Sequence, residues 1–222
     1  MAALLIIFAK EPLAGQVKTR LSPPLSADAA ARLYKNFLED ILEEMARLPG
    51  LSLALAYTPD TALNFFKELT PPGVFLFPQE GGDLGERLVR AFDRGLAAGF
   101  GTVLVRNSDS PDLPGKIVLD AGQALESGQA DLVLGPSPDG GYYLVGLKAP
   151  RPELFQEMSW STPTVLADTL ARASGLSLVV RLLPHWPDID TLADLQTFLK
   201  RRPWPDAPGR RTHLYAQKLL AG

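Results

Sequence analysis

The chain has 222 residues, of which 46% are hydrophobic and 21% charged, a composition typical of a folded globular domain rather than a disordered chain. Its formal net charge of -3 gives no general attraction for polyanions, so we expect neither a nucleic acid nor an anionic membrane as a partner. Because cysteine is absent, disulfides and cysteine-ligated zinc are excluded, and any metal must use oxygen or histidine ligands.

Short apolar runs alternate with longer segments of helical spacing. Strands are expected at 3–9, 51–57, 74–77, 102–105, 131–134 and 142–147, and helices at 26–48, 84–98, 114–126, 162–174 and 191–201. The helix from 26 is the clearest, because Ser26 can cap it and apolar residues recur at every fourth position from Leu33 to Met45. For the helix from 162, Thr162 and Pro163 suit the N-cap and the first turn.

This alternation predicts βαβ units in a single domain that spans 1–222. The runs 102–105 and 131–134 are almost wholly apolar, as expected for a largely parallel sheet covered by helices on both faces, and 142–147 is a candidate antiparallel strand. Residues 203–222 are interpreted as a proline-rich linker followed by a short helix packed on the domain. No stretch is long and apolar enough to span a bilayer, so we expect a cytoplasmic protein, and its oligomeric state is left open.

The loop after the first strand is the first candidate binding segment. Open α/β sheets bind ligands at the carboxyl ends of their strands, and this loop carries Lys10, Lys18 and Arg20 as cations suited to phosphate. Gly15 permits close approach of the backbone to a ligand. Val17 stands where a Walker A loop has glycine, so a P-loop NTPase is disfavoured, and a solvated basic loop is the alternative.

The segment after the strand at 102–105 carries two carboxylates, Asp109 and Asp112. Oxygen ligands of this kind suit Mg²⁺ or Mn²⁺, which can bridge a carboxylate to substrate phosphates, and Asp109 is the first candidate. Asp112 is interpreted as the cap of the helix that begins near Pro114.

Two later segments each allow a structural and a functional interpretation. Residues 135–146 contain the sequence Pro-Asp-Gly-Gly-Tyr, and a tight turn between two strands would explain its adjacent glycines without any ligand. Asp139 could also accept hydrogen bonds from the hydroxyl groups of a substrate. In 186–194, Asp188 and Asp190 would share one side of an extended segment, whereas Thr191 and Asp194 have the spacing of a capping box. Asp190 could serve either role.

Several motifs together resemble a known family. AKEPLAGQVKTRL, QEGGDLGERL, NSDSPDLP, LGPSPDGGYYLVGL, SWSTPTVLADTL and DIDTLADL are similar, in this order and over nearly the whole chain, to a bacterial family of GT-A nucleotide-diphospho-sugar transferases. That family is related to molybdenum-cofactor guanylyltransferase and to 2-phospholactate guanylyltransferase. The resemblance implies a Rossmann-like three-layer sandwich with a mixed, mostly parallel sheet.

The resemblance also implies a set of site residues. Asp109, Lys18 and Asp139 would be catalytic, and Asp109 and Asp190 would hold Mg²⁺ or Mn²⁺. The nucleotide would contact Ala9, Lys10, Gly15, Lys18, Arg20, Gln79, Gly82 and Gly85. The acceptor or sugar would contact Asp139, Gly140, Gly141, Tyr142, Trp160 and Ser161.

The function expected from this resemblance is metal-dependent glycosyl transfer from a nucleotide-sugar to a small-molecule acceptor. The first loop departs from the glycine-rich loop, ending in Arg and Lys, of typical sugar nucleotidyltransferases. Nucleotidyl transfer to a phosphorylated metabolite is the first alternative, since enzymes that transfer activated sugars and enzymes that transfer nucleotidyl groups share these site residues. A non-catalytic nucleotide-binding protein is the second alternative. Such a protein would be free to lose its metal-binding carboxylates, whereas Asp109 and Asp190 are both present here.

Overall fold

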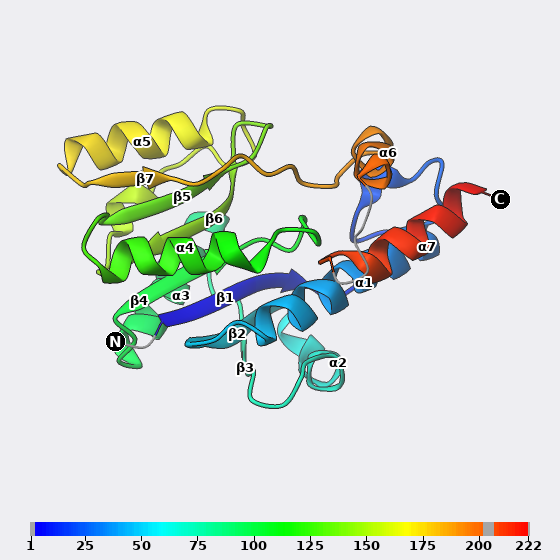
Figure 1. Ribbon diagram of the computed structural model, residues 1–222, viewed down its shortest axis with the longest axis horizontal. Helices are drawn as coiled ribbons and strands as arrows, with labels where there is room; N and C mark the ends of the chain where they lie inside the picture. The colour runs from blue at the N-terminus through cyan, green and yellow to red at the C-terminus, as the bar shows by residue number, and fades with distance from the viewer. Residues whose placement is uncertain (1–2, 202–206, 222) are drawn as a thin grey trace.

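The computed structural model describes residues 3–201 and 207–221 (Figure 1). Its strands are β1 (Ala3–Lys10), β2 (Leu51–Thr58), β3 (Phe75–Pro78), β4 (Thr102–Arg106), β5 (Leu132–Pro136), β6 (Tyr142–Leu147) and β7 (Val180–Leu182). Its α-helices are α1 (Ala27–Ala46), α2 (Leu63–Leu69), α3 (Leu84–Ala97), α4 (Gly115–Glu126), α5 (Val165–Gly175), α6 (Leu192–Lys200) and α7 (Arg210–Ala221).

All seven described strands form one sheet in the order β3-β2-β1-β4-β6-β5-β7. β1 pairs in parallel with β2 on one side and with β4 on the other, so the strand order reverses between β1 and β4. β6 is antiparallel to both β4 and β5, whereas the other pairings in the described chain are parallel. The predicted mixed, mostly parallel sheet and the predicted antiparallel run at 142–147 are confirmed.

Alternate residues of the strands bury two separate cores, because successive side chains of a strand point to opposite faces. Leu5 and Ile7 of β1 pack with α1 and α4, while Leu4 and Ile6 pack with α3 and α5. These are the three layers expected of a sheet covered on both faces. In Figure 1, α1 and α4 lie on the face turned toward the viewer.

Most element boundaries agree with the predicted ones to within two residues, and α1 begins as expected, with the Ser26 hydroxyl accepting from the amide of Ala29. The predicted start at 162 was wrong. α5 begins at Val165 with Thr164 as its N-cap, because Thr162 donates its hydroxyl to Ser159 instead and Ser161 has a left-handed backbone with φ of 63°. The prediction missed α2 and β7, which have only seven and three residues.

The C-terminal helix α7 packs along α1, as Figure 1 shows. The Asp40 carboxylate of α1 accepts from the amides of Arg211 and Thr212 at the start of α7, at 3.0 and 2.8 Å. The predicted linker, 203–208, lies largely outside the described residues. Among the described residues, no helix combines the length and apolarity that crossing a membrane requires.

Candidate active site

A cleft of about 750 Å³ opens at the carboxyl ends of β1 and β4, where the strand order reverses. This is where open α/β sheets bind their ligands. The segments that line it include the loop after β1, the loop after β4, the turn between β5 and β6, residues 160–165, and the extended stretch before α6, and α1 and α3 contribute further side chains. Since β6 is antiparallel, the β5–β6 turn falls at the same end of the sheet as the loops after β1 and β4.

The ammonium group of Lys18 is buried in the wall of this cleft. Lys18 Nζ donates to Oδ1 of Asp109 at 2.6 Å, to the carbonyl oxygen of Ile189 at 2.7 Å, and to Oδ1 of Asp190 at 2.8 Å. Only 4% of the Lys18 side chain is exposed, and Nζ also lies 5.2 Å from the ring centre of Phe37. The loops after β1 and β4 and the stretch before α6 thus meet at one cation.

Burial alone would lower the pKa of Lys18, because it disfavours the charged form. The negative charges of Asp109 and Asp190 outweigh that effect and raise the pKa above its ordinary value. The side chain is therefore an ammonium ion whose three N–H donors all have partners.

Asp188 also lines the cleft, and its hydrogen-bond partners lie in the loop after β4. It accepts from Ser110 Oγ at 2.7 Å and from Asn107 Nδ2 at 3.1 Å, which ties the extended stretch to the loop after β4. Burial, followed by the negative charge of Asp109, raises the pKa of Asp188 to about 7. Asp188 and Asp190 share the cleft, as their alternate positions predicted, but they contact different partners.

A buried guanidinium group, that of Arg106, binds backbone carbonyls of the loop after β4. Arg106, only 1% exposed, donates through Nε to the carbonyl of Asn107 and through NH2 to that of Ser110, at 3.0 and 2.7 Å. Its NH1 has no hydrogen-bond partner among the described residues. Burial lowers the pKa of Arg106 to about 10, with Asp188 the largest opposing influence, so the group remains charged and offsets the acids of the cleft.

Tyr34 of α1 closes the floor of the cleft. Its hydroxyl forms a 2.6 Å hydrogen bond with Ser108 Oγ and accepts from the backbone amide of Lys10 at 3.1 Å. Burial and, next, the charge of Asp109 raise the pKa of Tyr34 to about 12, so it is a neutral phenol. It connects the loops after β1 and β4.

Lys10 and Arg20, the other two cations predicted to bind phosphate, differ from Lys18 in their surroundings. Lys10 and Arg20 line the cleft and are exposed, and neither charged group has a hydrogen-bond or ion-pair partner in the described part of the chain. Both can therefore contact a ligand without breaking an existing interaction.

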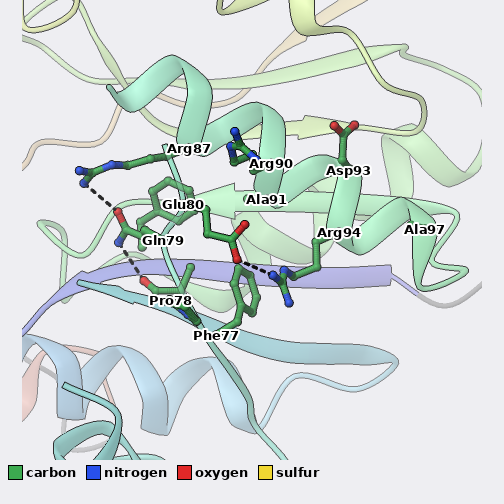
Figure 2. A pocket seen from close by; sticks show the side chains of 12 residues that line it. Phe77, Pro78, Gln79, Glu80, Arg87, Arg90, Ala91, Asp93, Arg94 and Ala97 are labelled. Carbon is green, nitrogen blue, oxygen red and sulfur yellow. Dashed lines mark hydrogen bonds and ion pairs between the residues drawn. The ribbon is translucent and has the colours of Figure 1, made fainter. Parts of the chain in front are cut away.

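Gln79 and Arg87 form the wall between this cleft and a smaller hollow of about 370 Å³ beside α3 (Figure 2). Gln79 Nε2 donates to the carbonyls of Ala9 and Ala56, which fixes its amide, and Arg87 reaches its Oε1 at 3.4 Å. In the smaller hollow, Arg94 pairs with Glu80 at 2.9 Å.

The predicted acceptor residues border the opposite side. Asp139, Gly141, Tyr142, Trp160 and Ser161 all line the cleft. Asp139 Oδ1 accepts from Ser137 Oγ at 2.5 Å and from the amide of Gly141 at 3.0 Å, which is turn chemistry, while no hydrogen bond of Oδ2 occurs among the described residues. Asp139 therefore shapes the turn and keeps one oxygen for a ligand.

Four predicted glycines do not lie on the cleft wall: Gly15, Gly82, Gly85 and Gly140. Gly85 and Gly140 instead allow close packing behind it. A Cβ on Gly85 would meet the Phe155 carbonyl at 2.4 Å and Trp160 Nε1 at 3.0 Å, and one on Gly140 would meet the Pro163 carbonyl at 2.0 Å.

The structure corrects one interpretation and resolves another. Asp112 does not cap α4, because its carboxylate accepts from Trp186 Nε1 at 3.0 Å and from Arg201 NH1 at 2.6 Å. The capping box of Thr191 and Asp194 is present at the start of α6, and the Asp190 carboxylate is left to face Lys18.

Asp109 and Asp190 fit a divalent ion in one respect. Each binds Lys18 through Oδ1, no hydrogen bond of Oδ2 occurs in either case within 3–201 and 207–221, and the two side chains are 34% and 38% exposed. No cluster of three or more acidic or histidine side chains suited to a metal occurs in that part of the chain. An ion there would need further oxygen ligands from substrate and water, which is how proteins commonly hold Mg²⁺.

Sequence reasoning missed Tyr34, Arg87 and Arg106. Tyr34 follows Leu33 in the apolar stripe of α1 and was therefore hidden among core residues. Arg106 carried a usable signal, since a charged residue ending an otherwise apolar strand needs buried partners. Arg87 is one of several arginines on an amphipathic helix, and no pattern in the sequence distinguishes it from the others.

Comparisons with known proteins show a matching family model and solved structures with the same fold. The family model described as "Uncharacterized protein conserved in bacteria (DUF2064)" matches residues 41–162. A crystal structure from Desulfovibrio desulfuricans G20, which bears the provisional name nucleotide-diphospho-sugar transferase, is 33% identical with a TM-score of 0.90, and the alignment covers 100% of this chain and 96% of that one. No curated protein matches the sequence.

More distant structures share the fold. CMP:2-keto-3-deoxy-manno-octonic acid synthetase complexed with CTP is 12% identical with a TM-score of 0.58, covering 99% of this chain and 100% of that one. The 4-diphosphocytidyl-2C-methyl-D-erythritol synthase of Anaerococcus prevotii DSM 20548 is 13% identical with a TM-score of 0.56, covering 90% and 96%. At these identities the likeness concerns the arrangement of the sheet and helices.

Proposed function

The chain belongs to the bacterial DUF2064 family, and from that premise we propose that it is a divalent-metal-dependent transferase that moves a sugar from a nucleotide-diphospho-sugar to a small-molecule acceptor. One observation carries the proposal: two carboxylates from separate segments, Asp109 and Asp190, meet at Lys18 in a cleft that also holds Lys10 and Arg20, two cations without a partner in 3–201 and 207–221. The 33% identical relative bears the provisional name nucleotide-diphospho-sugar transferase.

The donor would lie along the loop after β1. Lys10 and Arg20 would bind diphosphate oxygens, Arg20 as a planar fork and Lys10 as a point charge. The base and ribose would lie against Ala9 and the Gln79 amide, whose orientation is already fixed by two backbone carbonyls. A fixed amide discriminates between bases better than a freely rotating one.

Asp109 and Asp190 would hold Mg²⁺ or Mn²⁺ through their carboxylate groups. Bound there, the ion would supply charge stabilisation for the departing nucleoside diphosphate. The acceptor would enter beside the β5–β6 turn, where Asp139 Oδ2 can accept a hydrogen bond from its hydroxyl group. Tyr142, Trp160 and Ser161 would form the wall on that side.

Nucleotidyl transfer is the second candidate, since two of the structures that share the fold are named as synthetases or synthases of cytidylyl compounds. The two reactions break different bonds. Glycosyl transfer breaks the bond from the anomeric carbon to the β-phosphate and releases a nucleoside diphosphate, whereas nucleotidyl transfer attacks the α-phosphorus and expels pyrophosphate.

The test is to incubate the protein with Mn²⁺ and a panel of nucleotide-sugars, and to measure nucleoside diphosphate release. We expect slow release by attack of water even without the true acceptor. Asp109→Asn should abolish it, while Asp120→Asn, an equal charge change on the exposed Lys116–Asp120 pair of α4, should not.

Pyrophosphate release from a nucleoside triphosphate, dependent on a phosphorylated acceptor, would establish nucleotidyl transfer instead. If nucleotides bind but no turnover occurs with any donor, the chain is a nucleotide-binding protein and both transfer proposals fail. Calorimetry with Mn²⁺ and a nucleotide should show that folded Asp109→Asn has lost metal-dependent binding. Unchanged affinity would contradict the metal assignment.

A further inference from the structure

We propose that the Lys18 ammonium group is a built-in counter-cation that occupies the space between the two metal-binding carboxylates until a divalent ion displaces it. Loading of the ion and release of Lys18 would then be a single exchange. This inference rests on the proposed function, because the ion is part of it.

The contacts of Lys18 are those of a cation that is bound rather than free. All three N–H donors of its ammonium group have acceptors within 2.8 Å, and two of these acceptors belong to the carboxylate groups of Asp109 and Asp190, which are proposed to hold the metal. At 4% exposure the group has exchanged its water shell for these oxygens. In this state Lys18 has no donor left for a phosphate.

Electrostatics explains why such a cation is needed. Asp109 and Asp190 come from different segments of the chain, and Asp188 adds a third carboxyl group close behind them. Without a cation, like charges at this spacing would push the segments apart. A divalent ion carries one more positive charge than the Lys18 ammonium group, so it can replace Lys18 with a net gain in attraction to the carboxylates.

The backbone allows this exchange without refolding of the loop. Lys18 has a left-handed conformation with φ of 49° and ψ of 39°, and it lies between buried Val17 and the short 3₁₀ helix Thr19–Leu21, whose Leu21 is fully buried. These anchors hold the main chain while the long side chain can turn. Once released, its three donors become available to the diphosphate of the donor.

The decisive measurement is the affinity for Mn²⁺ alone, without nucleotide, by calorimetry on Lys18→Met. Removal of a competing cation should tighten Mn²⁺ binding by about tenfold or more relative to the unmodified protein. Lys10→Met is the matched control, because it makes the same charge change in the same cleft on an ammonium group that contacts no carboxylate among the described residues. It should alter the affinity far less.

A second readout is thermal unfolding. Metal-free Lys18→Met should unfold at a lower temperature than the unmodified protein, and Mn²⁺ should raise its midpoint by more than it raises that of the unmodified protein. Lys18→Arg keeps the charge, so it should show no tightening of Mn²⁺ binding. This variant also keeps the test informative if Lys18→Met does not fold.

The outcomes separate this inference from the proposed function. Equal or weaker Mn²⁺ binding by Lys18→Met, or tightening of the same size in Lys10→Met, would overturn the counter-cation role and leave the transferase proposal standing. Failure of every variant and of the unmodified protein to bind Mn²⁺, even with a nucleotide-sugar present, would overturn the metal assignment and this inference with it.

Discussion

Three cations on one loop have different surroundings. Lys18 is enclosed by carboxylate and carbonyl oxygens, whereas Lys10 and Arg20 extend into the cleft without partners in the described part of the chain. The buried cation, Lys18, therefore holds neighbouring segments together, while the two exposed cations, Lys10 and Arg20, remain available to a ligand. The exposed pair is what an incoming phosphate would meet first.

Replacing Arg20 by alanine should weaken binding of a nucleoside diphosphate by about tenfold or more while leaving that of the parent nucleoside nearly unchanged. The reason is that charge-assisted hydrogen bonds to phosphate are lost while the base pocket remains. Calorimetry with the two ligands measures the difference. Arg90→Ala, which removes an exposed arginine beyond the cleft wall, is the control, and equal losses for both ligands would refute the assignment.

For single residues, the location could be predicted from the sequence, while their roles stay predictions. Asp109, Asp190 and Asp139 follow strands or precede a helix at the carboxyl end of the sheet, and all three line one cleft. The partner of Lys18 could not be predicted, because whether it contacts phosphate or carboxylate depends on how segments remote in sequence approach one another. Tyr34 was missed for a similar reason, since its hydroxyl contacts become visible only after folding.

Elements were predicted well when an apolar period ran long enough to be counted. α1 and α3 agree with the expected spans, as do the inner strands, while the short α2 and β7 carry too few residues for a period. The error at the start of α5 has a different cause. Thr162 and Pro163 are good helix starters, but that segment instead packs against the β5–β6 turn, where Gly140 accepts from the amide of Leu166 at 2.9 Å.

Gly140→Ala should test how tightly this turn is packed. Alanine at a φ of +90° costs about 1 kcal/mol or more through backbone strain alone, and its Cβ would also meet the Pro163 carbonyl at 2.0 Å. We expect a clear decrease in the free energy of unfolding, measured by urea denaturation. We also expect weaker binding of the acceptor, which is proposed to enter beside this turn. Gly128→Ala is the control, since Gly128 has a φ of +73° with nothing within 4 Å, so it isolates the strain.

If the two alanine variants lose the same stability, the contact with Pro163 contributes nothing and the packing argument is wrong. If Gly140→Ala loses more, the difference measures the cost of separating the turn from residues 161–165.

At the scale of the whole molecule, α7 extends the layer formed by α1. Asp40 is the link, because its carboxylate accepts from two amides at the start of α7. Asp40→Ala would leave those amides without their acceptor, so we expect a loss of about 1 to 3 kcal/mol in the free energy of unfolding. The measurement is urea denaturation, combined with hydrogen exchange of the α7 amides.

Glu39→Ala is the matched control, since Glu39 neighbours Asp40 on α1 and pairs with Lys35 at 3.7 Å but accepts no hydrogen bond from an α7 amide in the described part of the chain. It should change stability little. Faster exchange in α7 of the Asp40 variant alone would confirm that this carboxylate holds the C-terminal helix on α1, and identical behaviour of both variants would contradict it.

The reversed strand β6 has a consequence for how such a protein can diversify. Because β6 runs against its neighbours, the β5–β6 turn joins the cleft from one side, while the loop after β1 reaches it from the other. The two substrates would therefore be recognised by segments that are separate in the chain and share no strand. If the proposed function holds, insertions or exchanges in 137–141 would change the choice of acceptor while the donor half keeps its sequence, so that one ancestral donor site would serve many acceptors.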